Sequence, residues 1–164
     1  MLSGIIFSLG TVRLVRLNTK VRYAVRMMAA LGSECQDGPV SLKDIAARHD
    51  LPKLYLPQLT GPLKHANLLK SVWGNKGGFE LARPASAISL REVFEAVDGP
   101  VSILDCVADP GACSHSSSCK CRSVWQEIND AIVSILDKYT IEDLEEAGCA
   151  LADEVTVSAR RREN

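Results

Sequence analysis

The sequence predicts a mainly α-helical protein with a single small β-hairpin, and three observations support this prediction. Hydrophobic residues recur at helical spacing along much of the chain. A glycine-rich turn at residues 74–78 separates two short alternating stretches, and a long amphipathic stretch occupies residues 123–139. With 164 residues, 46% of them hydrophobic and 5% aromatic, the chain can bury the core of one domain of ordinary size.

The first half of the chain is typical of a helix-turn-helix. Residues 19–33 form a first amphipathic helix whose apolar stripe consists of Ala24, Met27, Met28 and Leu31. Ser41, with Asp44 three positions later, predicts the N-terminal cap of a second helix over residues 42–48. A third helix is expected over residues 53–66. Two short helices joined by a tight turn in a basic segment indicate a helix-turn-helix.

A β-hairpin is predicted to follow this motif as a wing. Residues 68–72 alternate like a strand, residues 74–78 form the turn, and residues 79–81 return. Ser89 and Glu92 then have the spacing of a capping box at the start of a fourth helix. The expected fold is therefore a winged helix-turn-helix followed by a long helix.

The stretch over residues 123–139 is the longest amphipathic element of the chain. Its apolar stripe extends over about four turns and consists of Val124, Ile128, Ala131, Ile132, Ile135, Leu136 and Tyr139. A stripe of this length usually needs a partner to bury it. Packing within one chain is the alternative, but a long helix next to a small winged domain is a natural dimer interface. Thr140 with Asp143 predicts the cap of a last short helix.

The net charge of −1 hides two halves of opposite sign. Residues 1–90 carry twelve Lys or Arg against five Asp or Glu, for +7, whereas residues 91–164 carry seven against fifteen, for −8. A basic front half suits a phosphate backbone, whose field would repel the acidic rear half and so orient the molecule. The alternative is that both charge blocks only keep the surface hydrated.

The most informative feature is a group of four cysteines within sixteen residues: Cys106, Cys113, Cys119 and Cys121. The stretch also contains a proline, a glycine and several serines, so it cannot build a core of its own. Soft thiolate ligands at this density predict a metal site or an iron-sulfur cluster, with zinc as the alternative metal. Inert buried cysteines are the other interpretation, and it suits Cys35 and Cys149 better than this loop.

No segment is predicted to cross a membrane or to direct export. The apolar run Ile5-Ile6-Phe7 is far shorter than the ~20 residues of a membrane span and lacks a charged leader. We therefore expect a cytoplasmic protein whose cysteines are held by a metal or kept for redox work. An enzyme is not expected, because the sequence has no Ser-His-Asp set, paired catalytic carboxylates or phosphate-binding loop.

Several local strings, in a specific order, match one known family. They are Arg22-Tyr23-Ala24-Val25, Leu42-Lys43-Asp44-Ile45-Ala46, Tyr55-Leu56-Pro57-Gln58-Leu59, Gly74 to Phe79, Ile88 to Val93, and the loop cysteines followed by Trp125. From Val15 to about Tyr139 the chain resembles the IscR and NsrR type of winged-helix regulators, also called the Rrf family. The resemblance implies a homodimer that binds double-stranded operator DNA as a repressor or activator. It also implies a [2Fe-2S] or [4Fe-4S] iron-sulfur cluster that switches the affinity for DNA.

The resemblance also divides the chain into segments. The family's usual start lies at Val15, so residues 1–14 are expected to be an extension from an upstream start codon. The expected segments after it are a winged helix-turn-helix at 15–98, a cysteine loop at 99–122, a dimerisation helix with a short C-terminal helix at 123–147, and a flexible tail at 148–164.

By the resemblance, the cluster ligands are Cys106, Cys113 and Cys119, spaced C-x6-C-x5-C. At the places where relatives supply a fourth ligand, this chain has Arg22, Arg26 and Arg122. A guanidinium stays protonated and cannot coordinate iron. The nearest replacement is Cys121, followed by His115. An external thiol or water is the remaining option, and an open site would suit the sensing of nitric oxide or oxygen.

For DNA, the resemblance places the third helix in the major groove and the wing on the adjacent backbone or minor groove. The candidate contacts are Lys53, Tyr55 and Gln58 on the helix and Trp73, Asn75 and Lys76 on the wing. Gln58 is expected to pair with adenine, while the other two helix residues reach phosphate. The alternative for Tyr55 and Trp73 is a packing role.

The prolines of the third helix are unusual. A proline inside a helix removes a hydrogen bond, so Pro57 and Pro62 predict a kinked or shortened recognition helix. Relatives often have a glutamate or an arginine where this chain has Pro57 and Trp73, so we expect its operator to differ from theirs.

The expected switch is closure of the loop over residues 106–121, which fixes how the helix at 89–97 meets the helix at 123–139. That contact would set the separation of the two recognition helices in the dimer. Two alternatives stay open. One is a zinc-stabilised or thiol-redox regulator that uses the same cysteines. The other is a cluster-bearing accessory protein that has lost DNA binding.

Overall fold

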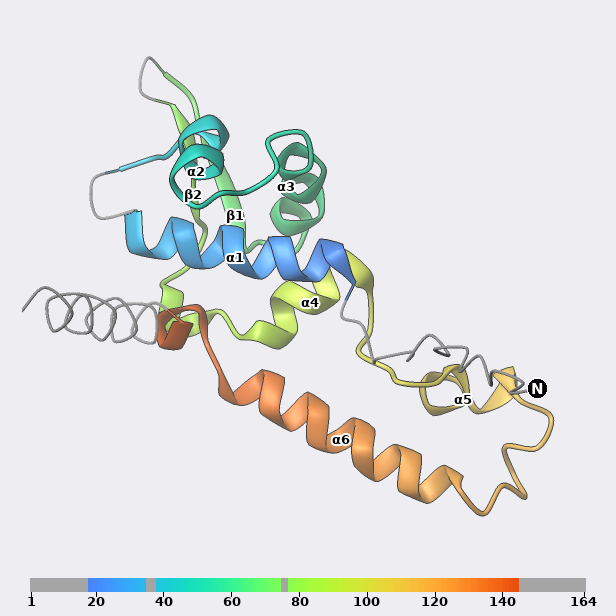
Figure 1. Ribbon diagram of the computed structural model, residues 1–164. Helices are drawn as coiled ribbons and strands as arrows, with labels where there is room; N and C mark the ends of the chain where they lie inside the picture. Colours follow the sequence, from blue (N-terminus) through green and yellow to red (C-terminus); the bar gives the residue numbers. More distant parts are fainter. Residues whose placement is uncertain (1–17, 35–37, 75–76, 145–164) are drawn as a thin grey trace, which may run out of the picture.

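The computed structural model describes residues 18–34, 38–74 and 77–144. It is mostly helical with one two-stranded antiparallel sheet, as the sequence predicted (Figure 1). Helices α1 to α4 and the hairpin pack together, while α6 extends below them as an arm with α5 near its start (Figure 1). The predicted extension at 1–14, the tail at 148–164 and the wing residues Asn75 and Lys76 lie outside the described residues.

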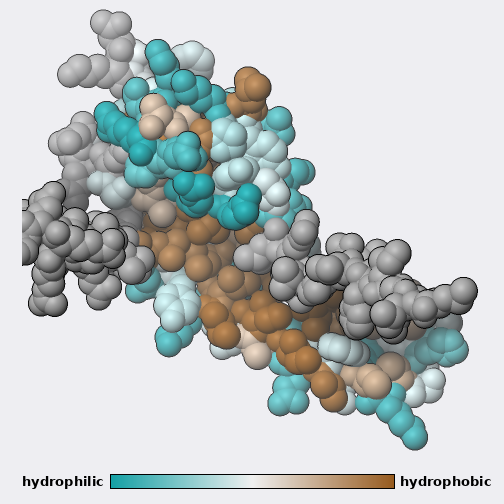
Figure 2. Space-filling view, viewed as in Figure 1, coloured by the Kyte–Doolittle hydropathy of each residue, from teal (hydrophilic) through white to brown (hydrophobic). Residues whose placement is uncertain are grey.

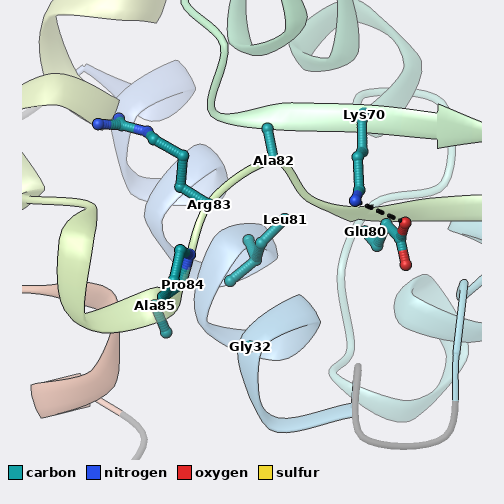
Figure 3. A pocket seen from close by; sticks show the side chains of 8 residues that line it. All are labelled: Gly32, Lys70, Glu80, Leu81, Ala82, Arg83, Pro84 and Ala85. Atoms are coloured by element: carbon teal, nitrogen blue, oxygen red, sulfur yellow. Dashed lines mark ion pairs between the residues drawn. The ribbon is translucent and has the colours of Figure 1, made fainter.

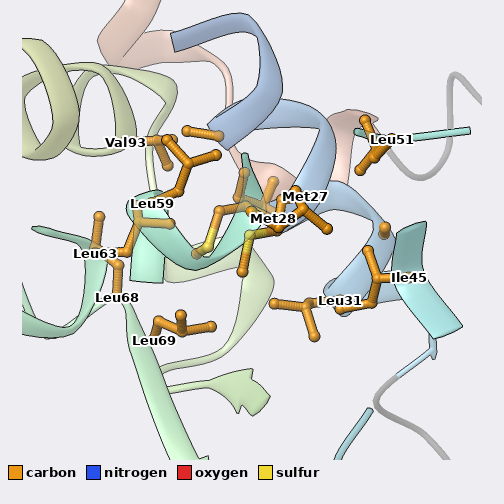
Figure 4. Packing of buried hydrophobic residues seen from close by; sticks show 14 of the residues in the cluster. Met27, Met28, Leu31, Ile45, Leu51, Leu59, Leu63, Leu68, Leu69 and Val93 are labelled. Atoms are coloured by element: carbon orange, nitrogen blue, oxygen red, sulfur yellow. The ribbon is translucent and has the colours of Figure 1, made fainter. Parts of the chain in front are cut away.

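The core forms around α1 (Thr19–Glu34), which packs against α3, α4 and the hairpin. Its predicted stripe is confirmed, since four side chains are each 0% exposed: Ala24, Met27, Met28 and Leu31. Neighbouring elements surround this stripe with buried side chains that include Ile45, Leu59, Leu63, Leu68 and Val93 (Figure 4). Burial of such a side chain stabilises the fold by ~1.5–3 kcal/mol, so this cluster fixes the helices relative to one another.

Helices α2 (Leu42–Arg48) and α3 (Leu56–His65) form the predicted helix-turn-helix. The Asp44 amide donates to Ser41 Oγ at 3.1 Å, which confirms the predicted cap. The turn between the helices includes Asp50 in the left-handed region, with φ of +49°. Short polar side chains tolerate this conformation, which is typical of turns.

The start of α3 corrects the sequence-based boundary. The helix begins at Leu56 and not at residue 53, because Pro57 suits the first turn, where a backbone donor has no helical partner. Lys53 therefore lies in the turn before α3, and Tyr55 lies at its N-cap position. Pro62 lies inside α3, as expected, and the helix continues past it to His65, so the shortening relative to the predicted span comes mainly from the later start.

Strands β1 (Leu69–Val72) and β2 (Gly78–Leu81) form the predicted wing, with Leu69 opposite Leu81 and Val72 opposite Gly78. Val40 extends this pairing by exchanging two backbone hydrogen bonds with Phe79, at 3.0 and 2.8 Å. Glycine is required at position 78, because a Cβ atom there would lie 2.5 Å from the Val40 carbonyl oxygen. The wing is therefore fixed to the segment that leads into α2.

A short turn, η2 (Ala85–Ala87), leads to α4 (Leu90–Asp98), which begins with the predicted capping box of Ser89 and Glu92. The cysteine segment, expected to be a loop, contains two short elements of its own. These are the helix α5 (Asp105–Ala108) and the 3-10 turn η3 (Pro110–Ala112).

The predicted long helix is α6 (Arg122–Lys138), and the chain then returns to the winged domain. The Leu90 amide donates to the Tyr139 carbonyl at 2.9 Å, and the Ile141 amide donates to the Ile88 carbonyl at 3.0 Å. Ile141 is 0% exposed within the core cluster, a contact that the sequence did not predict. Among the residues described, no helix is both long enough and apolar enough to cross a membrane.

Candidate functional site

The end of the molecule formed by the helix-turn-helix and the wing carries the predicted nucleic-acid contacts. Lys53 and Gln58 are both exposed, in the turn before α3 and in its first turns. The N-terminal residues of a recognition helix are the ones that reach base edges in a helix-turn-helix. Lys43, Arg48 and Lys64 are also exposed on α2 and α3 and add positive charge to this surface. The arrangement can bind a polyanion through several cations at once.

Tyr55 is placed differently from these exposed side chains. It is half-buried, and its ring meets the Tyr23 ring edge-on, with centroids 5.4 Å apart. The Arg22 guanidinium lies 5.2 Å from the centre of the Tyr23 ring. The Arg26 Nη2 atom donates to the His49 carbonyl at 2.6 Å, which connects α1 to the turn between α2 and α3. These contacts give Tyr55 a packing environment that holds the start of α3 against α1.

Trp73 lies at the tip of the wing, directly after β1, and is 94% exposed. The other two wing candidates, Asn75 and Lys76, are not among the described residues. Nearer the base of the hairpin, the Lys70 Nζ atom lies 3.0 Å from Glu80 Oε1, so its charge is paired within the hairpin. Trp73 is therefore the most accessible described side chain of the wing tip.

The four loop cysteines are all free thiols, distributed between α4 and α6. Cys106 lies in α5 and Cys113 follows η3, and both are half-buried, although no burial was expected for the loop. Cys119 and Cys121 are exposed just before α6. Within residues 18–34, 38–74 and 77–144, no three His, Cys, Asp or Glu side chains are grouped closely enough to hold one metal ion. The donors fit an iron-sulfur cluster chemically, but they do not converge on one point in this arrangement.

Two contacts connect the cysteine segment to α6. The Ile103 amide donates to Asn129 Oδ1 at 3.1 Å, and Asn129 is only 6% exposed. The Arg122 Nε atom lies 3.4 Å from the Cys106 carbonyl, a long hydrogen bond. Sequence reasoning missed Asn129. A signal was available, because Asn129 lies three positions before Ile132 and seven before Leu136. This spacing places a polar residue on the same face of the helix as these two apolar residues.

Helix α4 is joined to the C-terminal end of α6, next to the winged domain, through charged side chains. Arg91 donates from Nε to Glu95 at 2.9 Å and from Nη1 to Asp137 at 3.1 Å. Burial raises the pKa of Glu92, but hydrogen bonds from Arg83 and Ser89 and the Arg83 charge outweigh this, so its pKa lies below the ordinary value. Glu92 is therefore ionised at neutral pH, and it holds the capping box that starts α4.

One face of α6 is apolar and exposed. Its large side chains are between 40% and 57% exposed: Val124, Ile128, Ile135, Tyr139 and the neighbouring Trp125. Figure 2 shows hydrophobic side chains continuing along the arm where α6 lies. Only Asn129 of α6 is buried within this chain. The face we call the α6 seam consists of Val124, Ile128, Ile135 and Tyr139, and it is suited to bury apolar area against another surface.

A surface hollow of about 450 Å³ lies between the end of α1 and the base of the hairpin (Figure 3). Its charged groups are already paired, since Lys70 meets Glu80 across the hollow. Arg83 extends away from the hollow (Figure 3), and its Nη2 atom lies 2.8 Å from Glu92 Oε1. The lining that is described thus offers a ligand no unpaired charge, so the hollow is not our candidate site.

Comparison with known proteins agrees with this arrangement of a winged domain and an arm. Residues 17–147 match the model of the Rrf2 family, which is described as an iron-dependent transcriptional regulator. The chain is 35% identical over 130 residues to the HTH-type transcriptional regulator CymR of Bacillus subtilis, covering 79% of this chain and 89% of that protein. It is 37% identical over 130 residues to the HTH-type transcriptional regulator IscR of Yersinia pseudotuberculosis, covering 79% of each.

Solved structures support the same relationship. The structure of CymR, the global cysteine regulator of B. subtilis, matches with a TM-score of 0.68 and 34% identity over 82% of this chain and 98% of that chain. The structure of IscR from T. potens matches with a TM-score of 0.66 and 32% identity over 85% and 91%. The chain therefore belongs to the Rrf2 family, as a DNA-binding, winged-helix transcriptional regulator and not an enzyme.

Proposed function

We propose that this chain is a homodimeric, cytoplasmic repressor whose operator affinity is switched by an iron-sulfur cluster. The cluster ligands would be Cys106, Cys113 and Cys119, with Cys121 as the fourth. The main support is the position of the cysteine segment, which follows α4 directly, precedes α6, and is held to α6 by the buried Asn129. The description of the matching family as iron-dependent supports the same sensing chemistry.

The donor set suits this role better than it suits packing. Thiolates are the usual protein ligands of iron-sulfur clusters, and two of the four thiols are exposed. When bound, such a cluster supplies a redox-active centre that reacts with oxygen or nitric oxide. The loop residues would have to converge from their present separated positions. Convergence would therefore reshape the segment between α4 and α6.

The switch would act through contacts already present at both ends of α6. In the first half of α6, Arg122 and Asn129 form hydrogen bonds with the segment that carries the cysteines. At the end of α6, Asp137 is bonded to Arg91 of α4. A closed loop would hold α6 at one angle to α4, and an open loop would let that angle vary. An effector can shift this equilibrium only by binding one state more tightly than the other.

The dimer would form through the α6 seam. A second copy of the same helix is the natural cover for it, because symmetric homodimers are the commonest oligomers and match symmetric operators. The angle of α6 would then set the distance between the two α3 helices. Half-sites are about 34–36 Å apart along DNA, so a small change in this angle would weaken binding.

The DNA contacts that we propose combine exposed side chains of the helix-turn-helix with Tyr55 and with the wing residues that the family resemblance indicates. Gln58 would read adenine in the major groove, and Lys53 would bind phosphate. Tyr55 would position the start of α3 through Tyr23 and also reach phosphate with its hydroxyl. On the wing, Trp73, Asn75 and Lys76 would meet the neighbouring groove and backbone.

The test begins with anaerobic purification and analysis of iron, acid-labile sulfide and zinc. We expect visible absorption and stoichiometric iron and sulfide, which Cys113→Ser should abolish. A duplex selected from a random library should then bind the cluster-loaded protein more tightly than the cluster-free protein at fixed salt. Protein that never contains iron or sulfide, or equal affinity of both forms for every selected duplex, would overturn the proposal.

The fourth ligand needs its own variant. Cys121→Ser should change the visible spectrum of the anaerobic protein, with His115→Ala as the matched control that leaves it unchanged. An unchanged spectrum for Cys121→Ser would remove Cys121 from the ligand set and leave the three-cysteine site in place.

The exposure of Cys119 and Cys121 also favours a second candidate function, in which these thiols themselves sense redox state or bind zinc. A relative described as a global cysteine regulator fits this alternative. A colourless protein with stoichiometric zinc would support the zinc version. DNA affinity that falls on oxidation and returns with a reductant, in protein free of iron, would support the thiol version.

A further inference from the structure

Trp73 is the most exposed large hydrophobic side chain among the residues that the structure describes, at 94%. Leu54, in the turn before α3, is next at 90%, whereas the exposed apolar residues of the arm lie between 40% and 57%. The α6 seam has a natural cover in a second copy of the helix. Trp73 follows β1 directly, at the tip of the wing. The wing and α6 lie at opposite ends of the molecule (Figure 1).

Trp73 lies between β1 and Gly74, and the described residues around it have a defined backbone. Gly74 has a φ of +137°, which strongly favours glycine, and its carbonyl accepts from the Gly77 amide at 2.9 Å. A Cβ atom at Gly77 would lie 2.6 Å from the Val72 carbonyl oxygen, so the turn closes tightly. The hairpin behind it is fixed to Val40 by two further hydrogen bonds. The backbone on both sides of Trp73 is therefore ordered before binding, and mainly the side chain has to be immobilised.

The chemistry of this side chain determines which part of DNA it suits. An indole ring carries no charge for a phosphate, and the nearest described cation on β1, Lys70, is paired with Glu80. The flat apolar face of the indole ring is suited to stack on the exposed face of a base. Apolar side chains that enter the minor groove act as wedges between neighbouring base pairs and kink the duplex.

We propose that Trp73 is such a wedge: it enters the minor groove beside each half-site, stacks on a base and opens one base step. The inference rests on the operator binding of the proposed function and specifies how the wing reads DNA. Pyrimidine–purine steps such as TA and CA/TG unstack most easily, so the wedge selects these steps where the wing lies. A dimer carries two wedges and bends its operator on both sides.

The experiment uses the full-length protein, purified anaerobically, and a duplex that the wild type selects from a random library. Tryptophan emission is followed as the duplex is added to wild type and to Trp73→Phe, in which Trp125 is the only tryptophan. The difference between the two traces reports Trp73 alone. Affinity, its salt dependence and duplex bending are measured for wild type, Trp73→Phe, Trp73→Ala and Trp73→Arg. Circular dichroism confirms that each variant folds, as the exposure of this position predicts.

Four results are expected. The duplex quenches wild type strongly but Trp73→Phe only weakly, and Trp73→Phe keeps the bend. Trp73→Ala loses about ten- to a hundredfold in affinity, as expected for one lost base stack, and it straightens the duplex. Its salt slope equals that of wild type, because no phosphate contact is lost, whereas Trp73→Arg steepens the slope by about one unit. Trp73→Ala also loses the preference for pyrimidine–purine steps at the flanks.

Equal quenching of wild type and Trp73→Phe, or unchanged affinity and bend in Trp73→Ala, would overturn the wedge and leave the regulator function intact. Failure of the wild type to select any duplex from the library would overturn both. A Trp73→Ala variant whose salt slope falls by about one unit would assign Trp73 to the backbone and not to the bases, which also contradicts the wedge.

Discussion

The winged domain and the α6 arm are built in opposite ways. In the winged domain, α1 to α4, the hairpin and Ile141 bury one continuous apolar cluster, and the side chains of Met27, Met28 and Leu31 are fully enclosed. Between residues 99 and 139, only Val107 and Asn129 are buried, and one of these two is polar. The arm therefore has very little apolar burial of its own.

This difference separates a rigid part from an adjustable part. A domain with a large buried cluster keeps one arrangement, because any other arrangement exposes apolar area to water. An arm that is held by a few hydrogen bonds and an ion pair can change its angle at small cost. The switch that we propose uses both, because the DNA-binding surface would stay fixed while the separation of the two copies in the proposed dimer is adjusted.

The largest expected effect comes from comparing a substitution in the core of the winged domain with one on the α6 seam. Leu31→Ala removes a side chain that is 0% exposed and should lower the free energy of unfolding by about 2–5 kcal/mol. Ile135→Ala, at a position 57% exposed on the α6 seam, should leave the stability of the single chain nearly unchanged and weaken the dimer. Urea unfolding and sedimentation at several protein concentrations distinguish the two effects. Similar losses of single-chain stability from both changes would contradict the division.

The next prediction concerns the main polar contact of the arm. Asn129→Leu removes the acceptor of the Ile103 amide and should cost about 1–3 kcal/mol, because a part-buried donor is left without a partner. Asn129→Asp is the matched control, since it keeps an oxygen at the same place. The measurement is hydrogen exchange at the Ile103 amide together with urea unfolding. Equal exchange rates in wild type and Asn129→Leu would show that the contact does not hold the loop.

Two glycines of the winged domain are expected to respond to alanine in opposite ways. Gly61 lies in α3, and a methyl group added there would meet no residue other than its neighbours in the helix. The ring of Pro62 disfavours a helical conformation for a preceding residue with a Cβ atom, so Gly61→Ala should stabilise the protein by less than the ~0.5–1 kcal/mol of an ordinary helical glycine. Gly78→Ala should destabilise it, because the new Cβ atom would lie 2.5 Å from the backbone of Val40. Thermal unfolding shows whether each variant is more or less stable than the wild type. Stabilisation by Gly78→Ala would mean that the wing is not fixed to Val40.

The smallest expected effect is pH-dependent. The depressed pKa of Glu92 means that its ionised form stabilises the folded state at neutral pH, and that this contribution is lost as the pH falls through the folded pKa. Glu92→Gln keeps the shape of the side chain and should cost less than about 1 kcal/mol at pH 7, since both partners of the Arg83 pair are partly exposed. Urea midpoints should converge with those of wild type at acid pH, once Glu92 is protonated in the folded protein as well. A difference that stays constant from neutral pH to the acid limit of folding would contradict this.

Much of the winged domain could be predicted because its signals are local. The caps at Ser41 and Ser89 and the buried stripe of α1 depend on spacing within one or two turns, and the structure contains each of them. The start of α3 was predicted too early because Lys53 and Leu54 extend the helical spacing of polar and apolar residues toward the N-terminus. The burial of Ile141 was missed because it depends on a strand-like contact with Ile88, far away in sequence.

The sequence by itself determined that this chain is a winged helix-turn-helix with a cysteine-rich segment and a long amphipathic helix, because helical periodicity, capping residues and ligand chemistry are properties of neighbouring residues. Only the tertiary structure decided which side chains of that helix stay exposed, that Asn129 holds the cysteine segment to it, and that Tyr55 packs inward while Trp73 points outward. These outcomes depend on tertiary contacts between segments that are far apart in the sequence. The burial of a side chain is set by those contacts and cannot be read from its own segment alone.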